Sequence, residues 1–179
     1  MKKYELTEET FTVFGKTLYR IRAVRDFGSV KTGEFGGYIE KEENLSHFGN
    51  AWIYGDAWVY GDARVSGNAW IYGDARVYGN AKVYGDARVS GNARVYGNAE
   101  VFNTRHFFVQ GPIGSRDGYV TFYRTKDDTV EVRCGCFSGS LQEFVNQVEE
   151  THGGSRYEKE YKLAAELAKV CIRLEGESR

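Results

Sequence analysis

The sequence predicts a mainly β protein in which a coil of very short strands precedes a small α+β domain. A six-residue unit, Gly-(Asp/Asn)-Ala-x-(Val/Ile)-(Tyr/Ser/Phe), occurs nine times without an insertion between Gly49 and Phe102. The composition, with 22 Gly, 13 Tyr and one Pro in 179 residues, suits tight turns and strands better than helices. After Phe102 the repeat stops and helical periodicity appears. We therefore expect three regions, residues 1–48, 49–102 and 103–179.

Each unit of the repeat is predicted to be one corner and one short strand. Gly followed by Asp or Asn tolerates left-handed backbone angles, which a sharp corner requires. In the other four positions, Ala and Val/Ile alternate with a variable residue and Tyr, Ser or Phe, which is the period of a strand. A helix is excluded because its propensity would be wrong in every unit. The inward Ala and Val/Ile side chains are buried only when units stack, and each Val/Ile then contributes about 1.5–3 kcal/mol.

The repeat resembles the hexapeptide repeat of left-handed parallel β-helix proteins. In that family an aliphatic residue and a small residue four places later face inward, as Val59 and Ala63 would here. The resemblance implies three hexads per coil, so residues 49–102 are three full coils of 18 residues. The left-handed sense comes from the resemblance alone, since the general rule for crossovers favours the right-handed one. The family also implies a homotrimer and, as one candidate activity, acyl transfer.

A narrower resemblance links the chain to GNA-repeat proteins of phage and prophage genomes. It rests on GGYIE at 36–40 and NLS at 44–46 before the repeat, and on GPIGSR at 111–116 and CGCF at 134–137 after it. It implies a phage or prophage origin and a partner in the host, such as a component of antiviral defence.

Residues 1–48 are predicted to form a cap and an imperfect first coil. Ile39 and Leu45 lie twelve and six residues before Ala51, so they continue the inward positions with larger side chains. Such side chains would plug the open end of the coil, where strand edges need cover. Residues 4–24 are expected to form a strand hairpin.

The 18-residue coil places the outward side chains in ladders. Trp52, Trp70 and Arg88 share one face, Trp58, Arg76 and Arg94 a second, and Arg64, Lys82 and Glu100 a third. A patch of Trp52, Tyr54, Trp70 and Tyr72 would be large for an exposed surface, which favours an interface over a solvated ladder. The predicted interface comprises Trp52, Tyr54, Trp58, Trp70, Tyr72, Arg76 and Arg94.

Residues 103–179 are predicted to contain three strands and two helices. The strands are expected at 106–110, 118–125 and 129–134. Capping boxes at Ser140/Glu143 and Ser155/Glu158 open the helices, of which the second runs to about Leu174. Its apolar sector is broad enough to pack on more than one surface.

A candidate anion site combines the first helix start with the glycine-rich loop. Ser138 and Ser140 precede free helical N–H groups, and Ser115 and Arg116 offer a hydroxyl and a guanidinium fork. The two segments would act together only if the strands bring them to the same end of the sheet. The alternative is a hairpin turn and an ordinary helix cap.

The sequence predicts neither a metal nor a cofactor nor a catalytic residue. Cys134, Cys136, Cys171 and His152 could be imagined as zinc ligands, but their spacing is not that of C-x-x-C sites. The repeat tract contains no His that could act as the base for acyl transfer, and His106 is the nearest after it.

Charge and hydropathy narrow the function further. The chain has 24 Lys and Arg against 25 Asp and Glu, balanced in each region, which disfavours bulk nucleic-acid binding. An apolar run of membrane-spanning length and a signal-peptide pattern are absent, and three Cys suggest a reducing cytoplasm. We expect a cytoplasmic, non-catalytic binding or assembly protein acting through an oligomeric β-helix. The alternatives are a small-anion or nucleotide-binding protein that uses the C-terminal domain, and an acyltransferase.

Overall fold

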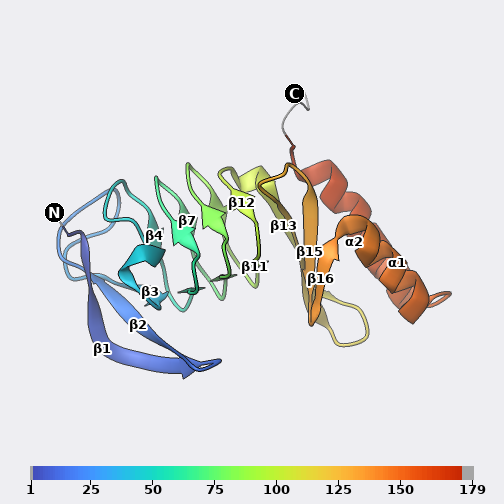
Figure 1. The fold of residues 1–179 in the computed structure, drawn as a ribbon, viewed down its shortest axis with the longest axis horizontal. Coiled ribbons are helices and arrows are strands. Elements are labelled where there is room, and N and C mark those ends of the chain that lie inside the picture. The colour runs from blue at the N-terminus through green and yellow to red at the C-terminus, as the bar shows by residue number, and fades with distance from the viewer. Residues whose placement is uncertain (1, 175–179) are drawn as a thin grey trace.

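The structure, a computed structural model, describes residues 2–174 and is elongated (Figure 1). A strand hairpin at the N-terminal end is followed by a stack of β coils, and then by an antiparallel sheet with two helices on its far side. The mainly β fold with a parallel β-solenoid is therefore confirmed.

The N-terminal residues form the predicted hairpin and imperfect first coil. Strands β1 (Tyr4–Val13) and β2 (Lys16–Ala23) pair antiparallel, and β3 (Phe35–Ile39) pairs antiparallel with β2. On its other edge β3 pairs parallel with the first full coil, where Ile39 lies opposite Val59. After the 3-10 turn η1 (Glu42–Asn44), Leu45 forms a parallel bridge with Val65. Both Ile39 and Leu45 are fully buried, as predicted.

The solenoid consists of nine two-residue strands arranged on three faces. The strands are β4 (Trp52–Ile53), β5 (Trp58–Val59), β6 (Arg64–Val65), β7 (Trp70–Ile71), β8 (Arg76–Val77), β9 (Lys82–Val83), β10 (Arg88–Val89), β11 (Arg94–Val95) and β12 (Glu100–Val101). Pairing steps by one coil, as in Trp52 opposite Trp70 and Trp70 opposite Arg88. One face is β4-β7-β10, another is β6-β9-β12, and the third continues the N-terminal sheet as β1-β2-β3-β5-β8-β11. The left-handed sense stays a prediction.

The inside of the solenoid contains the predicted Ala and Val/Ile side chains. All of them between Ala51 and Val101 are at most 1% exposed. Corners need glycine for two reasons, which Gly67 illustrates. Its φ is +68°, and a Cβ there would lie 2.9 Å from the backbone nitrogen of Gly85 on the next coil. Side chains after the glycines form a polar ladder, in which Asn50 donates to Asn68 at 3.1 Å and Asn68 donates to Asp86 at 3.1 Å.

The C-terminal part has one more strand than the sequence predicted. After the 3-10 turn η2 (Thr104–His106), strands β13 (Phe107–Ile113), β14 (Gly118–Arg124), β15 (Val130–Cys134) and β16 (Phe137–Ser140) form an antiparallel sheet in chain order. The prediction missed β16 because Phe-Ser-Gly-Ser is typical of a turn. Its pairing with β15, with Cys134 opposite Phe137, makes it a strand.

The two helices follow directly. Helix α1 (Leu141–His152) begins with the predicted capping box of Ser140 and Glu143. Helix α2 (Arg156–Cys171) begins at the predicted Ser155 cap and ends three residues earlier than expected. In residues 2–174, no helix is long and apolar enough to cross a membrane.

The C-terminal sheet separates two cores. On one face Val120, Phe122 and Val132 pack with residues of α1 and α2. On the other face Tyr123 is fully buried and belongs to the core of the solenoid, whose open end it closes. Additional bonds join the last coil to the sheet: Arg94 N donates to Thr121 Oγ1 at 2.9 Å, and Lys126 N donates to Asn98 O at 3.0 Å.

Candidate binding cleft and surfaces

The aromatic patch predicted on the first face of the solenoid is largely closed. Trp52 is fully buried, because Phe27 and Tyr4 of the N-terminal cap cover its ring at centroid distances of 5.3 and 6.3 Å. The prediction that Trp52 is exposed was therefore wrong. The predicted stacking of Trp52 on Trp70 was correct. The repeat period alone does not reveal that a segment outside the repeat covers Trp52.

Of the other predicted interface residues, Tyr72 and Arg94 are exposed, and the rest are half-buried, namely Tyr54, Trp58, Trp70 and Arg76. Tyr54 packs edge-on against Trp70 at 5.5 Å, and the Arg88 guanidinium lies 4.7 Å from the Trp70 ring. On the second face, Phe11 of the hairpin contacts Trp58 at 4.7 Å. Tyr72 is 37% exposed, so what remains open on the first face is small.

The structure does not assemble the predicted anion site. The Ser140 hydroxyl and backbone N–H both donate to the Glu143 carboxylate at 2.8 Å, so a side chain already occupies the helix start. Moreover, Ser138 lies opposite Arg133, and β16 carries the helix start at Ser140 away from Ser115 and Arg116. Ser140 lies opposite Glu131, at the end of β15 remote from Cys134. The helix start at Ser140 and the β13–β14 loop are thus at opposite ends of the sheet, a consequence of the strand that the sequence analysis missed.

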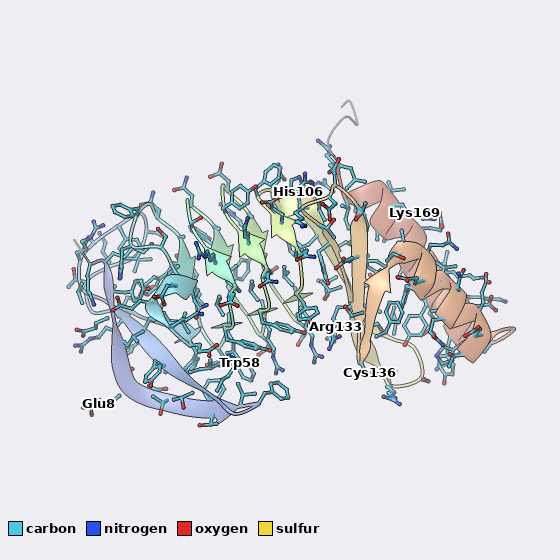
Figure 2. The ribbon with its side chains drawn as sticks, viewed as in Figure 1. Glu8, Trp58, His106, Arg133, Cys136 and Lys169 are labelled. Atoms are coloured by element: carbon cyan, nitrogen blue, oxygen red, sulfur yellow. The ribbon has the colours of Figure 1, made fainter. Side chains whose placement is uncertain are left out.

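A cleft of about 700 Å³ lies at the end of the sheet where Ser115 and Arg116 are found. Four parts of the chain line it: the solenoid corners and strands β8 and β11, the β13–β14 loop, the β15–β16 turn at Cys136, and the helices. Figure 2 shows Cys136 at this lower end of the sheet and Arg133 between the sheet and the solenoid. Solenoid residues lining the cleft are Asp74, Arg76, Asn92 and Arg94.

The cleft has an excess of positive charge. Among residues 2–174, three guanidinium groups line the cleft, from Arg76, Arg94 and Arg116. The carboxylate of Asp74 is the one negatively charged side chain that the described residues contribute to this lining. Within the part of the chain that the structure describes, Arg94 and Arg116 make no side-chain hydrogen bond or ion pair. The Arg76 guanidinium lies 4.0 Å from the centroid of the Trp58 ring. Guanidinium groups without carboxylate partners favour an anionic ligand.

The helix side of the cleft is tightly built. Burial raises the pKa of the Cys134 thiol, which interacts with the Tyr161 hydroxyl, and burial raises the pKa of Tyr161 to about 12. Tyr161 also packs against His152 at 5.6 Å. At the cleft margin Gly114 N donates to Glu160 Oε2 at 2.6 Å, which fixes the β13–β14 loop to α2. Both tyrosine and cysteine are therefore neutral at physiological pH.

The residues considered for metal binding and acyl transfer do not form sites. In residues 2–174 no three His, Cys, Asp or Glu side chains are placed to hold a metal, and Cys171 does not line the cleft with Cys134 and Cys136. His106 is 7% exposed and packs edge-on against Phe102 at 4.2 Å. Figure 2 shows it at the upper edge of the molecule, away from Cys136.

Helix α2 presents a second surface. Its Ala164, Ala165 and Ala168 are buried against the sheet and α1. The apolar stripe of α2, which we define as Leu163, Leu167 and Val170, is 70%, 47% and 81% exposed. The sequence predicted that this helix packs on more than one surface, but in the described chain the stripe is uncovered.

Comparison with known proteins supports the solenoid assignment. The family model described as the YdcK beta solenoid repeat matches four overlapping segments, residues 57–73, 69–85, 81–97 and 87–101. No curated protein matches the chain. The chain thus contains a β-solenoid repeat, and the match lies entirely within the nine hexads.

Sequence reasoning selected some of the residues that line the cleft, but it assigned them to other sites. Arg76 and Arg94 were selected as interface residues and Arg116 as an anion ligand, and the cleft brings these three together. It missed Tyr119, Phe137 and Tyr161. The 18-residue step could have indicated that Arg94 lies on the coil next to the C-terminal sheet, but nothing in the sequence places the β13–β14 loop beside it.

Proposed function

We propose that this protein is a non-catalytic binding and assembly protein, in which a rigid β-solenoid is held in a homotrimer through helix α2. The observation that carries this proposal is the apolar stripe of α2, whose three side chains are each at least 47% exposed. Contiguous apolar side chains on a helix surface are characteristic of an interaction site. The solenoid's first face supports it less well, because Trp52 is buried.

The spacing of the stripe is that of a coiled-coil seam. Leu163, Leu167 and Val170 are separated by four and three residues, which corresponds to heptad positions d, a and d. In parallel coiled coils, Leu at a with a β-branched residue such as Ile at d favours three or four helices over two. Leu167 at a and Val170 at d follow that preference. A second copy of this chain is therefore the occupant that we propose for the stripe.

Light scattering coupled to size-exclusion chromatography tests the assembly. We expect the wild-type protein to elute with the mass of a trimer and Leu167→Lys with the mass of a monomer, with unchanged circular dichroism. Phe48→Lys is the matched control, because Phe48 is 81% exposed and lies in the N-terminal region. A monomeric wild type, or a trimer that Leu167→Lys leaves intact, would show that α2 is not the contact between copies.

We propose in addition that the protein comes from a phage or prophage and inhibits a host antiviral component. The GGYIE and CGCF segments, together with the hexads, support this by their resemblance to phage GNA-repeat proteins. The test is the plating efficiency of a phage on a host that carries an active defence system, with and without expression of the protein. Restored plating that is lost in Leu167→Lys would connect the inhibition to assembly.

A further inference from the structure

We propose that the cleft between the solenoid and the C-terminal sheet binds a free nucleoside phosphate. This site is independent of the α2 stripe and of the assembly proposed above. Its volume of about 700 Å³ lies within the range of small-ligand sites. Its lining combines the guanidinium groups of Arg94 and Arg116, which have no carboxylate partner among the described residues, with aromatic rings.

The guanidinium side would bind the phosphate. Arg94 and Arg116 approach the cleft from different elements, strand β11 and the β13–β14 loop, and neither has a carboxylate partner among the described residues. The backbone of Arg94 is fixed because its N–H donates to Thr121 Oγ1 at 2.9 Å. A guanidinium fork donates two parallel hydrogen bonds to phosphate oxygens, and these charge-assisted bonds are about twice as strong as neutral ones.

Arg76 supplies a third positive charge that is already positioned. Its guanidinium lies over the Trp58 ring at 4.0 Å, which restricts the side chain before a ligand arrives. Less side-chain entropy is then lost on binding. The three arginine charges outnumber the single carboxylate of Asp74, so the electrostatic potential of the cleft favours the entry of an anion.

The aromatic side would bind the base. Tyr119 lines the cleft and is 42% exposed, so its ring surface is available to a ligand. On the helix-facing side of the sheet, Phe137 packs against Phe144 at 5.5 Å, and these rings line another part of the cleft with Tyr161. Stacking of a base on an aromatic ring contributes about 1–3 kcal/mol and does not depend strongly on base identity.

Polar groups beside these walls match the rest of a nucleotide. The side chains of Gln147 and Thr151 are exposed at the α1 side of the cleft. At the solenoid side Asp74 is exposed and Asn92 is half-buried. They offer both donors and acceptors, which sugar hydroxyls and base edges need. A simple inorganic anion would use the arginines and leave the aromatic and amide groups without a role.

Isothermal titration calorimetry at low ionic strength tests the proposal. The probes are AMP, GMP, CMP and UMP with their diphosphates, inorganic phosphate, the corresponding nucleosides, and a short single-stranded oligonucleotide. We expect at least one nucleoside phosphate to bind with a Kd below 1 mM, and the nucleoside and inorganic phosphate to bind at least tenfold more weakly. Arg94→Ala and Arg116→Ala should each weaken nucleotide binding about tenfold or more.

Two further variants separate the parts of the site. Tyr119→Ala should weaken nucleotide binding and leave any inorganic phosphate binding unchanged. Arg64→Ala is the matched control, because Arg64 occupies the equivalent outward hexad position on another face and is exposed. Binding of phosphate as tight as that of every nucleotide, tighter binding of the oligonucleotide, or no nucleotide binding at 1 mM would overturn the proposal. So would equal losses in Arg64→Ala and Arg94→Ala.

Discussion

The two ends of the solenoid are both closed by antiparallel strands, but in different ways. At the N-terminal end, β3 pairs along the first coil, and the cap buries Trp52, Tyr4 and Lys3 completely. At the C-terminal end, β14 crosses the last coil, and Thr121, Tyr123 and Thr125 contact it. The other end of β14, at Tyr119, borders the cleft.

The comparison indicates which end of the solenoid is fully packed and which end borders an open cleft. The N-terminal cap continues a solenoid sheet, so its side chains fill the open end layer by layer. The C-terminal sheet has its own helix-covered core and closes the coil with Tyr123, beside which Phe107 and Val109 also pack against the solenoid core. The C-terminal sheet therefore does not depend on the solenoid for its whole core, and the cleft lies beside its Tyr119 end.

The largest effect is expected at the closed end. Trp52→Ala removes a fully buried ring that Phe27 and Tyr4 contact, which should lower the free energy of unfolding by about 3–5 kcal/mol. Trp70→Ala, at the next rung of the same face, should cost less because Trp70 is only half-buried. Urea unfolding followed by circular dichroism measures both. Equal losses would mean that the cap adds nothing to the first rung.

A smaller effect is expected from the buried ammonium group of the same cap. Lys3 Nζ donates to Ala51 O at 2.7 Å, and burial, with the nearby Arg25, lowers the pKa of Lys3 to about 8. Between pH 8 and the unfolded value of 10.5 the unfolded chain therefore binds more protons, so stability rises with pH there. The gain should be on the order of 2 kcal/mol.

Lys3→Met provides the comparison for this pH dependence. Near pH 10 the ionisation of tyrosines in the unfolded chain opposes the rise in stability. Both proteins have the same tyrosines, so this contribution cancels in the difference between their stabilities. From pH 7 through 8 to 9.5, the difference in denaturant midpoint between the two proteins should shift in favour of the wild type. A constant difference across this range would mean that Lys3 keeps its ordinary pKa in the folded protein.

The sequence predicted what the repeat itself determines. A single periodicity determines the inward positions of Val59 and Ala63, the 18-residue step and the burial of Ile39 at the end of the coil. Because every unit repeats it, a mistaken assignment in one unit does not change the assignment of the others. Trp52 was misjudged because the residues that cover it, Tyr4 and Phe27, belong to no repeat. Their position depends on a hairpin and a loop whose path has no sequence signature.

The cleft was harder to predict for a similar reason. It needs the solenoid, the β13–β14 loop and α1 to converge, and each of these is anchored by long-range contacts such as Gly114 N to Glu160. The position of Ser140 shows how one unrecognised strand changes the geometry. Because β16 adds a strand after the Cys136 turn, the helix start lies at the other end of the sheet.

A still smaller difference in stability is expected between Ala substitutions of corner glycines in the first and the last coil. Gly49 and Gly91 both have positive φ, +70° and +64°, so Ala at either position costs about 1 kcal/mol in backbone strain. A Cβ on Gly49 would also overlap the carbonyl oxygen of Gly67, whereas Gly91 has nothing within 4 Å. Gly49→Ala should therefore lower the thermal midpoint more than Gly91→Ala. Equal shifts would show that the stack yields at its closed end.

The smallest effect on stability is expected at the cleft itself. Arg116 is exposed and makes no side-chain hydrogen bond or ion pair within residues 2–174, so Arg116→Ala should change the free energy of unfolding by less than about 0.5 kcal/mol. Removing one of several like charges around the cleft would, if anything, stabilise the unliganded protein. Chemical denaturation without added nucleotide measures this. A loss above about 1 kcal/mol would mean that Arg116 holds the C-terminal sheet in place, and that this end is closed by the same kind of contacts as the N-terminal one.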